Sequence, residues 1–479
     1  MTDRVVIVGN GMAGARLASE LHARGGDRKV TVLGAEPHRA YNRIMLSTLL
    51  AGKVGEPDVE LAEVAGQGVD LRTGVTVTAV DRTARTVHTA DGDRIGYDHL
   101  VLATGSRAIV PPLPGLDGDR LPPRVAAFRT LDDCRRILAA ARGARRALVL
   151  GGGLLGLEAA RGLAARGLDV GVVHPVPYLM ERQLDPAGAA VLADTLAGLG
   201  VTTHLAVAAT GLAADADGVA LTLADGRTLT ADLLVLSCGV RPDTALAAAA
   251  GLAVERGVLV DDRLRTSDRR ISAIGDCAQH DGTLTGLVAP AWAQARVVAQ
   301  VLTGEDRLAR YRPRPVVTRL KAAGIDLAAM GEPEGGEAGE ELTFADPARG
   351  TYARLRIRDE RLTGAILLGD NPAVGTVIQL FDRGQPVPAD RRSLLLGRAF
   401  GAPAAAPAAS PALMPDAATV CQCNNVSKGA LVSCWRSGAR TADAVVAATR
   451  AGTGCGGCRD AVTGIVDWLS EVDSVEVAR

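Results

Sequence analysis

The chain has 479 residues, of which 47% are hydrophobic and 22% charged, so it can bury more than one core and is neither one small domain nor a disordered polymer. Its 53 Lys and Arg residues nearly balance 54 Asp and Glu residues, which gives no electrostatic reason to expect nucleic acid or an anionic membrane as a partner. The N-terminus has charges at Asp3 and Arg4 and glycines inside its short apolar run, which is not the pattern of a signal peptide. No apolar stretch reaches the roughly 18 residues of a membrane helix. We therefore expect a soluble, cytoplasmic protein.

A strand, a glycine-rich turn and a helix-compatible stretch open the chain. The apolar residues 5–8 lead into the turn, and a second apolar run at residues 30–33 is followed by Glu36. In a doubly wound nucleotide domain such glycines let the backbone approach a pyrophosphate at a helix N-terminus, and the acidic residue accepts hydrogen bonds from a ribose. This context favours a dinucleotide site over an unliganded turn. The glycines of the motif are Gly9, Gly11 and Gly14.

The same design recurs in the middle of the chain. Residues 146–150 lead into a second turn, Glu158 lies in the helix-compatible stretch after it, and an apolar strand follows at residues 170–173. Two such motifs predict two dinucleotides, and an enzyme that holds two usually passes a hydride between them. The glycines of the second turn are Gly151, Gly153 and Gly156.

The residue after the second strand of this motif is His174, where a site that prefers NADH commonly has Asp or Glu. The missing carboxylate removes a repulsion against a 2′-phosphate, and His174 itself could donate to that phosphate, with Arg182 further along the chain. The alternative is a histidine exposed on a loop. The hypothesis from the sequence is that the site accepts NADPH at least as well as NADH.

The last sixty or so residues contain five of the eight cysteines. Four of them form CxC followed by CxxC, a set of thiolates that fits either a [2Fe-2S] cluster or tetrahedral zinc. Paired zinc ligands usually lie about two to four residues apart, so the one-residue gap favours the cluster. The glycines of GTGCGGC permit positive φ and could turn backbone N–H groups toward cluster sulfurs. The four expected ligands are Cys421, Cys423, Cys455 and Cys458.

The other cysteines form no CxxC or CxxxxC pair, and residues 40–50, where a flavin disulfide reductase carries its redox dithiol, contain no cysteine. We expect these cysteines to be small buried residues. Without a dithiol, a reduced flavin must pass its electrons elsewhere. A flavin accepts a hydride and can release electrons singly, and a [2Fe-2S] cluster accepts one at a time, so the chain would convert paired electrons into single ones. The cysteines in question are Cys134, Cys238, Cys277 and Cys434.

The predicted fold class is α/β: two doubly wound nucleotide-binding domains, one inserted in the other, an α+β C-terminal domain and a small helical [2Fe-2S] domain. The strands at residues 100–105 and 271–276 suggest that the second domain interrupts the first. Shorter strand signals lie at 316–320, 352–357 and 363–368, and an Ala/Pro-rich linker follows. The expected ranges are 1–111 and 241–308 for the first nucleotide-binding domain, 112–240 for the second, 309–400 for the α+β domain, 401–419 for the linker and 420–479 for the cluster domain.

These motifs together resemble those of the ferredoxin reductase class of pyridine-nucleotide flavoproteins. They are more closely similar to the N-terminal part of NAD(P)H nitrite reductase large subunits and to the electron-transfer subunit of assimilatory nitrate reductase. The tail resembles [2Fe-2S] domains of the bacterioferritin-associated-ferredoxin type, and the resemblance covers essentially the whole chain. The segments that carry it are VIVGNGMAG, AYNRIMLS, LATGS, VLGGGLLGLEAA, MERQLD, CGVRP, AIGDCA, GLVAPAWAQA, CQCNNVSKGAL and AGTGCGGC.

The resemblance implies FAD at the first turn, NAD(P)H at the second, and a [2Fe-2S] cluster on the four tail cysteines. Glu36 would contact the adenosine ribose of FAD and Asp276 its ribityl chain, while Glu158 and Gly239 would lie near the nicotinamide. The implied FAD site consists of Gly9, Gly11, Met12, Ala13, Gly14, Glu36, Arg43, Ser47, Val77, Ala103, Thr104, Gly105 and Asp276. The implied NAD(P)H site consists of Gly151, Gly153, Gly156, Glu158 and Gly239, and His174, which departs from the family pattern, joins this set because of its position after the second strand.

Besides His174, two features depart from the family pattern. Thr48 stands where many ferredoxin reductases have a lysine that contacts FAD, so we expect that contact to be absent. Nitrite reductase large subunits continue into a sirohaem and [4Fe-4S] half, whereas 21 residues follow Cys458 here. The expectation is therefore that the terminal acceptor is a separate nitrate or nitrite reductase catalytic subunit.

Three functions remain open from the sequence. The preferred one is an NAD(P)H-oxidising FAD/[2Fe-2S] electron-transfer subunit of nitrate or nitrite assimilation. The second is a general ferredoxin, rubredoxin or iron-mobilising reductase, and the third is a redox-sensing iron-sulfur flavoprotein module.

Overall fold

The computed structural model describes residues 3–61, 68–116, 121–320, 322, 324–331, 339–396, 411–416, 418–421, 424, 426–453 and 458–477. The chain forms two compact units, each built from segments that are distant in the sequence. The first unit comprises Met1–Arg43, Glu56–Ile109 and Val240–Arg314, and the second comprises Ile44–Gly55, Val110–Gly239 and Pro315–Arg479.

A five-stranded parallel sheet is the centre of the first unit, with the strand order β19-β7-β1-β2-β3. The edge strand β19 belongs to the last segment of the unit, so the sheet is completed only after the chain has passed through the second unit. This agrees with the strand signals at residues 100–105 and 271–276. The strands are β1 (Asp3–Val8), β2 (Arg28–Gly34), β3 (Val69–Thr73), β7 (His99–Leu102) and β19 (Ile271–Ala273).

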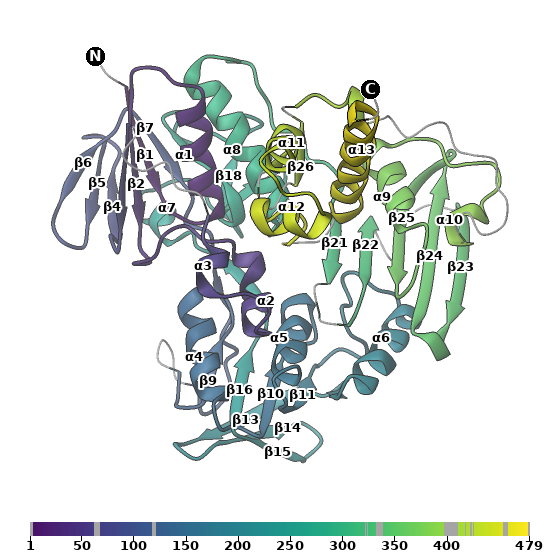
Figure 1. Cartoon of the computed structure of the whole chain (residues 1–479). Helices are drawn as coiled ribbons and strands as arrows, with labels where there is room; N and C mark the ends of the chain where they lie inside the picture. Colours follow the sequence, from purple (N-terminus) through teal and green to yellow (C-terminus); the bar gives the residue numbers. More distant parts are fainter. Residues whose placement is uncertain are drawn as a thin grey trace. The chain divides into compact units, whose positions relative to one another are not determined.

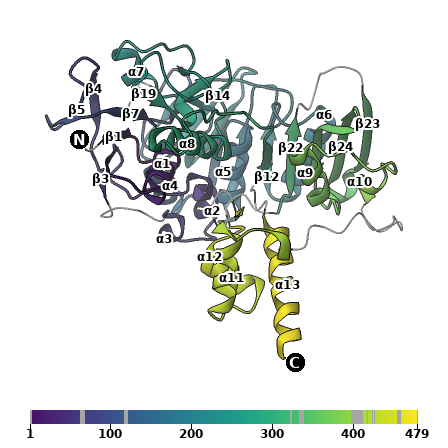
Figure 2. The same cartoon turned by 90° about the horizontal axis from the view of Figure 1, so that it is seen from above.

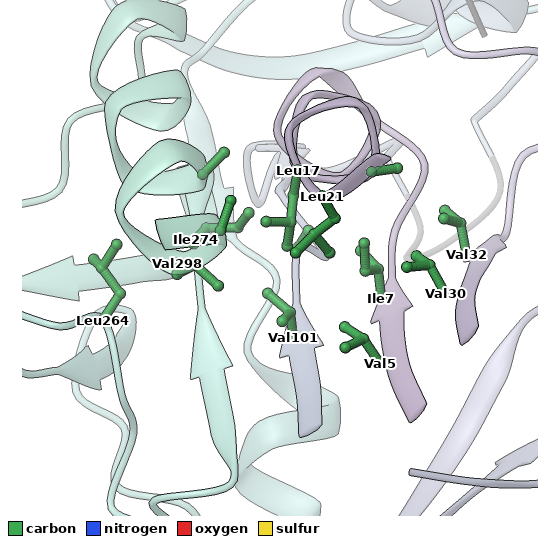
Figure 3. Close-up of a cluster of buried hydrophobic side chains, with 14 of the residues drawn as sticks. Val5, Ile7, Leu17, Leu21, Val30, Val32, Val101, Leu264, Ile274 and Val298 are labelled. Carbon is green, nitrogen blue, oxygen red and sulfur yellow. The ribbon is translucent and has the colours of Figure 1, made fainter. Parts of the chain in front are cut away.

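Both faces of this sheet are buried, which explains why its strands read as continuous apolar runs. Because side chains alternate along a strand, Val5 and Ile7 of β1 face one cluster and Val6 and Val8 face another. Figure 3 shows the first cluster, in which β1 and β2 pack beneath Leu17 of α1 and its neighbours. The helices over this face are α1 (Met12–Ala23) and α8 (Val288–Thr303) (Figure 1).

The second cluster of the first unit includes a three-stranded antiparallel sheet and a short helix. These elements are β4 (Val77–Asp81), β5 (Thr86–Thr89), β6 (Arg94–Gly96) and α7 (Ala245–Ala249). The smaller elements of this unit are α3 (Glu56–Val59), the paired strands β8 (Ser106–Ala108) and β17 (Val240–Pro242), and the paired strands β18 (Val258–Val260) and β20 (Ala278–His280).

The second unit contains another five-stranded parallel sheet, with the order β12-β11-β10-β16-β9. A three-stranded antiparallel sheet consists of β13 (Ala209–Ala214), β14 (Val219–Leu223) and β15 (Thr228–Ala231). Its apolar side chains share one buried cluster with side chains of the parallel sheet. The parallel strands are β9 (Val125–Ala127), β10 (Arg146–Leu150), β11 (Asp169–Val173), β12 (Val201–His204) and β16 (Leu233–Leu236). The helices are α2 (Leu46–Leu50), α4 (Leu131–Ala141), α5 (Leu154–Ala164) and α6 (Pro186–Gly198).

An antiparallel sheet of five strands follows in the second unit, in the order β21-β22-β25-β24-β23. Helix α9 (Val374–Arg383) packs on it through Val377 and Phe381, and α10 (Ser393–Leu396) adds Leu394 to the same core. The strands are β21 (Val317–Leu320), β22 (Leu327–Gly331), β23 (Glu340–Asp346), β24 (Thr351–Arg358) and β25 (Arg361–Leu368). The sequence predicted β21, β24 and β25 but not the other two.

Three helices and a small hairpin form the C-terminal group, which Figure 2 shows in yellow. The predicted linker residues 401–410 lie outside the described residues, but the end of that segment is structured: Pro411–Leu413 forms a short 3-10 turn, and Met414 packs against the group. The elements are β26 (Thr419–Cys421), β27 (Val426–Ser427), α11 (Lys428–Arg436), α12 (Ala442–Thr449) and α13 (Arg459–Val477). The fold class predicted from the sequence is confirmed.

Helix α13 has 19 residues but is amphipathic. In the described part of the chain, no helix combines the length and the hydropathy that a bilayer-spanning segment needs.

Candidate functional site

The first glycine-rich turn joins β1 to α1. Gly9 has φ of +115°, and a Cβ added there would lie 2.1 Å from the Ala103 carbonyl oxygen. A Cβ on Gly14 would lie 1.9 Å from the Gly9 carbonyl oxygen, so both positions need glycine for packing. By contrast, no atom of the described residues lies within 4 Å of a Cβ on Gly11. That side of the turn is open to a ligand.

A buried amide in the same turn also points to a ligand. The side-chain Nδ2 of Asn10 is buried and, among the residues that the structure describes, has no hydrogen-bond partner. Such an unsatisfied group costs about 1–3 kcal/mol unless a ligand supplies the acceptor. Met12 and Ala13 begin α1, whose free N–H groups and positive dipole end favour an anion. The turn therefore fits a pyrophosphate.

Glu36 lies just beyond β2 and is held by two residues. The Tyr41 hydroxyl donates to Glu36 Oε2 at 2.7 Å, and the Arg43 guanidinium forms an ion pair with Glu36 Oε1. The Cζ atom of Arg43 also lies 4.9 Å from the centroid of the Tyr41 ring. Burial alone would lower the pKa of Arg43, but Tyr41, Glu36 and Asp276 raise it overall. The carboxylate predicted to meet a ribose is thus oriented by a charged arginine and by Tyr41, which the sequence did not single out.

Thr104, Gly105 and Asp276 lie close together in the first unit. The Thr104 hydroxyl donates to the Asp243 carbonyl oxygen at 2.6 Å, and the Asp243 N–H donates to the Gly105 carbonyl oxygen at 2.9 Å. Ser106 Oγ donates to Asp276 Oδ2 at 2.8 Å. The end of β7 is therefore tied to the later segment that carries Asp276, although the two are far apart in the sequence.

Two other predicted FAD residues, Val77 and Ser47, lie in elements outside the glycine-rich turn. Val77 starts β4, just after Gly74, whose N–H donates to the Glu36 carbonyl oxygen at 3.1 Å. Ser47 lies in α2 of the second unit and is 3% exposed. Its hydroxyl is buried with no hydrogen-bond partner in the described residues. An unsatisfied hydroxyl fits a ligand, but the placement of Ser47 beside FAD stays a prediction.

The second glycine-rich turn joins β10 to α5 and repeats the first. Gly151 has φ of +122°, and its added Cβ would lie 2.2 Å from the Ser237 carbonyl oxygen. A Cβ on Gly156 would lie 2.0 Å from the Gly151 carbonyl oxygen, whereas one on Gly153 meets no atom of the described chain within 4 Å. Two glycines are again required for packing, and the third leaves an open side.

Two other predicted residues belong to the same region. Glu158 lies in α5 and is 4% exposed. Gly239 has φ of +92° and follows β16, which pairs with β10 in the parallel sheet. Because the carboxyl ends of parallel strands meet at one edge, Gly239 lies at the edge of the sheet where the second turn begins. Their contacts with a nicotinamide stay predictions.

His174 follows β11 and is 6% exposed, so the interpretation as an exposed loop histidine is wrong. Its Nδ1 accepts from the Gly152 N–H at 3.2 Å, and its Nε2 lies 3.1 Å from Glu181 Oε2. The sequence missed both partners. Gly152 is a variable position of the glycine motif, and Glu181 is seven residues further along a loop.

Two of the four predicted cluster ligands are described. Cys421 is 0% exposed and Cys458 8% exposed, and both belong to the same apolar cluster. Asn424 Nδ2 donates to the Arg450 carbonyl oxygen and, at 3.0 Å, to Thr453 Oγ1. These bonds join the two segments that carry the cysteines. Cys423 and Cys455 lie outside the described residues, but the thiol donors that are present suit a [2Fe-2S] cluster.

The expectation that the other four cysteines are buried holds for two of them, since Cys238 and Cys434 are half-buried. Cys134 and Cys277 are completely buried, and the Cys277 thiol donates to the Leu102 and Ile274 carbonyl oxygens. Burial raises the pKa of Cys277, and it raises the pKa of Cys238 to about 11. At neutral pH these groups stay protonated, which makes them poor nucleophiles.

The comparisons with known proteins agree with this architecture. Residues 3–297 match the family described as pyridine nucleotide-disulphide oxidoreductase, residues 316–382 match the rubredoxin NAD+ reductase C-terminal domain, and residues 419–468 match the BFD-like [2Fe-2S] binding domain. The chain is 36% identical, over 97% of its length, to nitrite reductase [NAD(P)H] of Bacillus subtilis, covering 57% of that protein. It is 33% identical, over 99% of its length, to the assimilatory nitrate reductase electron transfer subunit of the same organism, covering 61% of it.

Among solved structures, a ferredoxin reductase from Rhodopseudomonas palustris superimposes with a TM-score of 0.73 at 31% identity, over 81% of this chain and 96% of that one. The chain spans about three fifths of the length of the two curated relatives.

Proposed function

The chain belongs to the pyridine nucleotide-disulphide oxidoreductase family, and we propose that it oxidises NAD(P)H on FAD and delivers single electrons, through a [2Fe-2S] cluster, to the catalytic component of an assimilatory nitrate or nitrite reductase. Its family and domain matches identify it as an NAD(P)H-dependent flavin oxidoreductase with a BFD-like [2Fe-2S] domain. It is related to nitrite reductases and to a nitrate reductase electron transfer subunit.

The observation that supports this proposal best is the repetition of one turn geometry in two separate sheets. In each turn two glycines are required for packing, and the remaining one, Gly11 or Gly153, faces open space. Two dinucleotides bound in this way are what a hydride transfer between a nicotinamide and a flavin requires.

We assign the FAD pyrophosphate to the turn at Gly11 and Asn10, where Asn10 Nδ2 gains an acceptor. Glu36, oriented by Tyr41 and Arg43, would accept hydrogen bonds from the adenosine ribose. When bound, FAD supplies the acceptor of a hydride and a donor of single electrons. The protein's part is to bind and orient the two dinucleotides.

The cysteines indicate where the electrons leave. Cys238 and Cys277 are free thiols, and a thiol is already reduced, so neither can accept electrons from a flavin as a disulfide would. The tail, by contrast, places Cys421 and Cys458 in one apolar cluster. A low-polarity shell of this kind tunes the potential of a cluster. The exit route is therefore the tail.

The identity of the acceptor is supported by relatedness. One relative is named as the electron transfer subunit of assimilatory nitrate reductase, and others are named as nitrite reductases. A separate nitrate or nitrite reductase subunit is the partner that we propose.

Reconstitution tests this proposal directly. Mixing the purified protein with candidate catalytic components should couple NAD(P)H consumption to nitrate or to nitrite. Cys421→Ser and Cys458→Ser should abolish that coupling and lower the iron content, while reduction of a two-electron dye continues. Cys434→Ser is the matched control, since Cys434 lies in α11 against the same apolar cluster and is not a predicted ligand. Full coupling in Cys421→Ser would contradict the exit route.

Truncation after residue 400 separates the two halves of the reaction. The shortened protein should stay yellow and reduce dyes with NAD(P)H, but it should no longer support the catalytic component. Undiminished coupling would show that electrons leave directly from the flavin.

A second candidate is favoured by the match of residues 316–382 to the rubredoxin NAD+ reductase C-terminal domain. A general rubredoxin or ferredoxin reductase would reduce such small proteins rapidly, and it would do so equally well without the tail. Comparing rubredoxin with nitrate and nitrite reductase components as acceptors, with and without residues 401–479, separates the two functions.

A further inference from the structure

The strand β11 ends at a position that decides which pyridine nucleotide a site of this kind accepts. A carboxylate directly after this strand usually accepts from the ribose 2′-hydroxyl. Here that position is His174, so the sequence leaves the site without the carboxylate. The structure supplies one from elsewhere in the same unit.

The hydrogen bonds of His174 fix where its proton lies. Nδ1 accepts from the Gly152 N–H at 3.2 Å, so in the neutral ring the proton is on Nε2. Nε2 lies 3.1 Å from Glu181 Oε2 and donates to it. The neutral imidazole therefore has no second N–H to offer to a 2′-phosphate.

The loop that carries Glu181 is anchored to the glycine-rich turn. The Met180 N–H donates to the Gly152 carbonyl oxygen at 3.1 Å, and Met180 is fully buried with φ of +53°. A non-glycine residue rarely adopts this left-handed conformation, and it persists only where its surroundings hold it. A Cβ on Gly152 would meet Leu179 at 2.7 Å and the His174 ring at 2.8 Å. A side chain at position 152 would therefore collide with both the loop and the imidazole, and glycine lets them pack together.

We propose that Glu181 takes the place of the missing carboxylate and that the site therefore prefers NADH to NADPH. The inference rests on the proposed function only in that the second turn binds a pyridine nucleotide. A carboxylate has about four lone-pair positions, of which His174 uses one, and a third of the Glu181 side chain is exposed. It can therefore accept from a ribose hydroxyl while its orientation is fixed by the imidazole.

The same charge acts against NADPH. A 2′-phosphate carries a charge of about -1.5 to -2 at neutral pH, and bringing like charges together in a binding site is unfavourable. Arg182, the neighbouring cation, is exposed to solvent, where its attraction for the phosphate is screened. The hypothesis of equal or better use of NADPH, drawn from the absent carboxylate at position 174, does not take Glu181 into account.

The experiment compares kcat/KM for NADH and NADPH in the full-length holoprotein, with a two-electron dye as acceptor. The wild type should favour NADH by at least about tenfold, and Glu181→Gln should reduce that ratio by about tenfold, mainly through KM, since a hydrogen bond to a charged group is worth about that factor. Glu181→Asp should restore part of the ratio. Asp194→Asn, an exposed residue of α6, removes the same charge and should leave the ratio unchanged.

A binding measurement keeps the test independent of turnover and folding. Calorimetric titration with ADP-ribose and with 2′-phospho-ADP-ribose should show the same preference for the unphosphorylated ligand and the same loss of preference in Glu181→Gln. Equal ratios in wild type and Glu181→Gln, or a wild type that prefers NADPH, would overturn the inference. A protein that keeps the NADH preference but fails to couple to nitrate or nitrite would refute only the proposed acceptor. Binding of neither ligand would refute the nucleotide site as well.

Discussion

Asp185 should be one of the residues on which the stability of the second unit depends. It is 2% exposed and caps α6 by accepting from the Gly188 N–H at 2.7 Å. The same carboxylate accepts from the Tyr352 hydroxyl at 2.7 Å and from Arg354 Nη1 at 2.7 Å. Both of these partners lie on β24, so a single side chain connects the nucleotide-binding sheet region to the C-terminal sheet.

The expected cost of Asp185→Ala follows from these contacts. Loss of the helix cap costs about 1 kcal/mol, and the buried Tyr352 hydroxyl loses its acceptor while Arg354 keeps its ion pair with Glu341, so the total is about 2–4 kcal/mol. Asp185→Asn keeps a good cap and loses mainly the charge, so we expect about 1–2 kcal/mol. Urea unfolding of the holoprotein followed by circular dichroism measures the difference, with Asp194→Ala on the exposed side of α6 as control.

The pH dependence provides a second check. Burial raises the pKa of Asp185, but the hydrogen bonds from Gly188, Tyr352 and Arg354 outweigh it and hold the pKa below its ordinary value. A lowered pKa in the folded state stabilises the protein above the unfolded pKa of about 3.9, and this contribution disappears as the pH falls through the folded pKa. The difference between wild type and Asp185→Ala should therefore be full at neutral pH and shrink in acid. If Asp185→Ala were as stable as Asp194→Ala at pH 7, the reasoning would be refuted.

The remaining predictions concern the first turn and one thiol. Gly11→Ala should fold but weaken FAD binding by about 1–3 kcal/mol, because its methyl group fills the open side of the turn; flavin titration of the apoprotein measures this, and undiminished affinity would place the pyrophosphate elsewhere. Gly9→Ala should fail to fold, since its methyl group would meet the Ala103 carbonyl oxygen at 2.1 Å. Cys238 should resist iodoacetamide until the pH approaches 11, because burial raises its pKa to about that value; rapid alkylation at pH 8, read by mass spectrometry, would contradict this.

The sequence predicted those features that depend on neighbouring residues. The glycine turns were identifiable because the motif lies within one strand, turn and helix, and a Cβ on Gly14 would meet the Gly9 carbonyl oxygen of the same turn; the contact that requires glycine at position 9 is with the distant Ala103 and could not be predicted. The strand β23, by contrast, is mostly exposed and lacks the apolar pattern that identifies a buried strand.

Contacts between distant residues were not predictable from local patterns. Asp185 and Tyr352 are separated by 167 positions, and nothing in either segment indicates the other. Glu181 is only seven residues from His174, but its approach depends on the left-handed conformation of Met180, a residue type that does not favour it. The sequence therefore predicted a nucleotide site at the second turn but not the residue that we propose selects its ligand.

The two turns have the same backbone design, so any difference in how long each retains its dinucleotide must come from residues around them. A flavin that serves many turnovers must stay bound, whereas a pyridine nucleotide must leave after each hydride transfer. The carboxylate near the first turn, Glu36, is held by two donors, Tyr41 and Arg43, one of them permanently charged. The carboxylate near the second, Glu181, is held by a single side chain, that of His174. A more firmly oriented acceptor loses less entropy on binding, so the first turn is the one suited to a resident cofactor and the second to a substrate that exchanges.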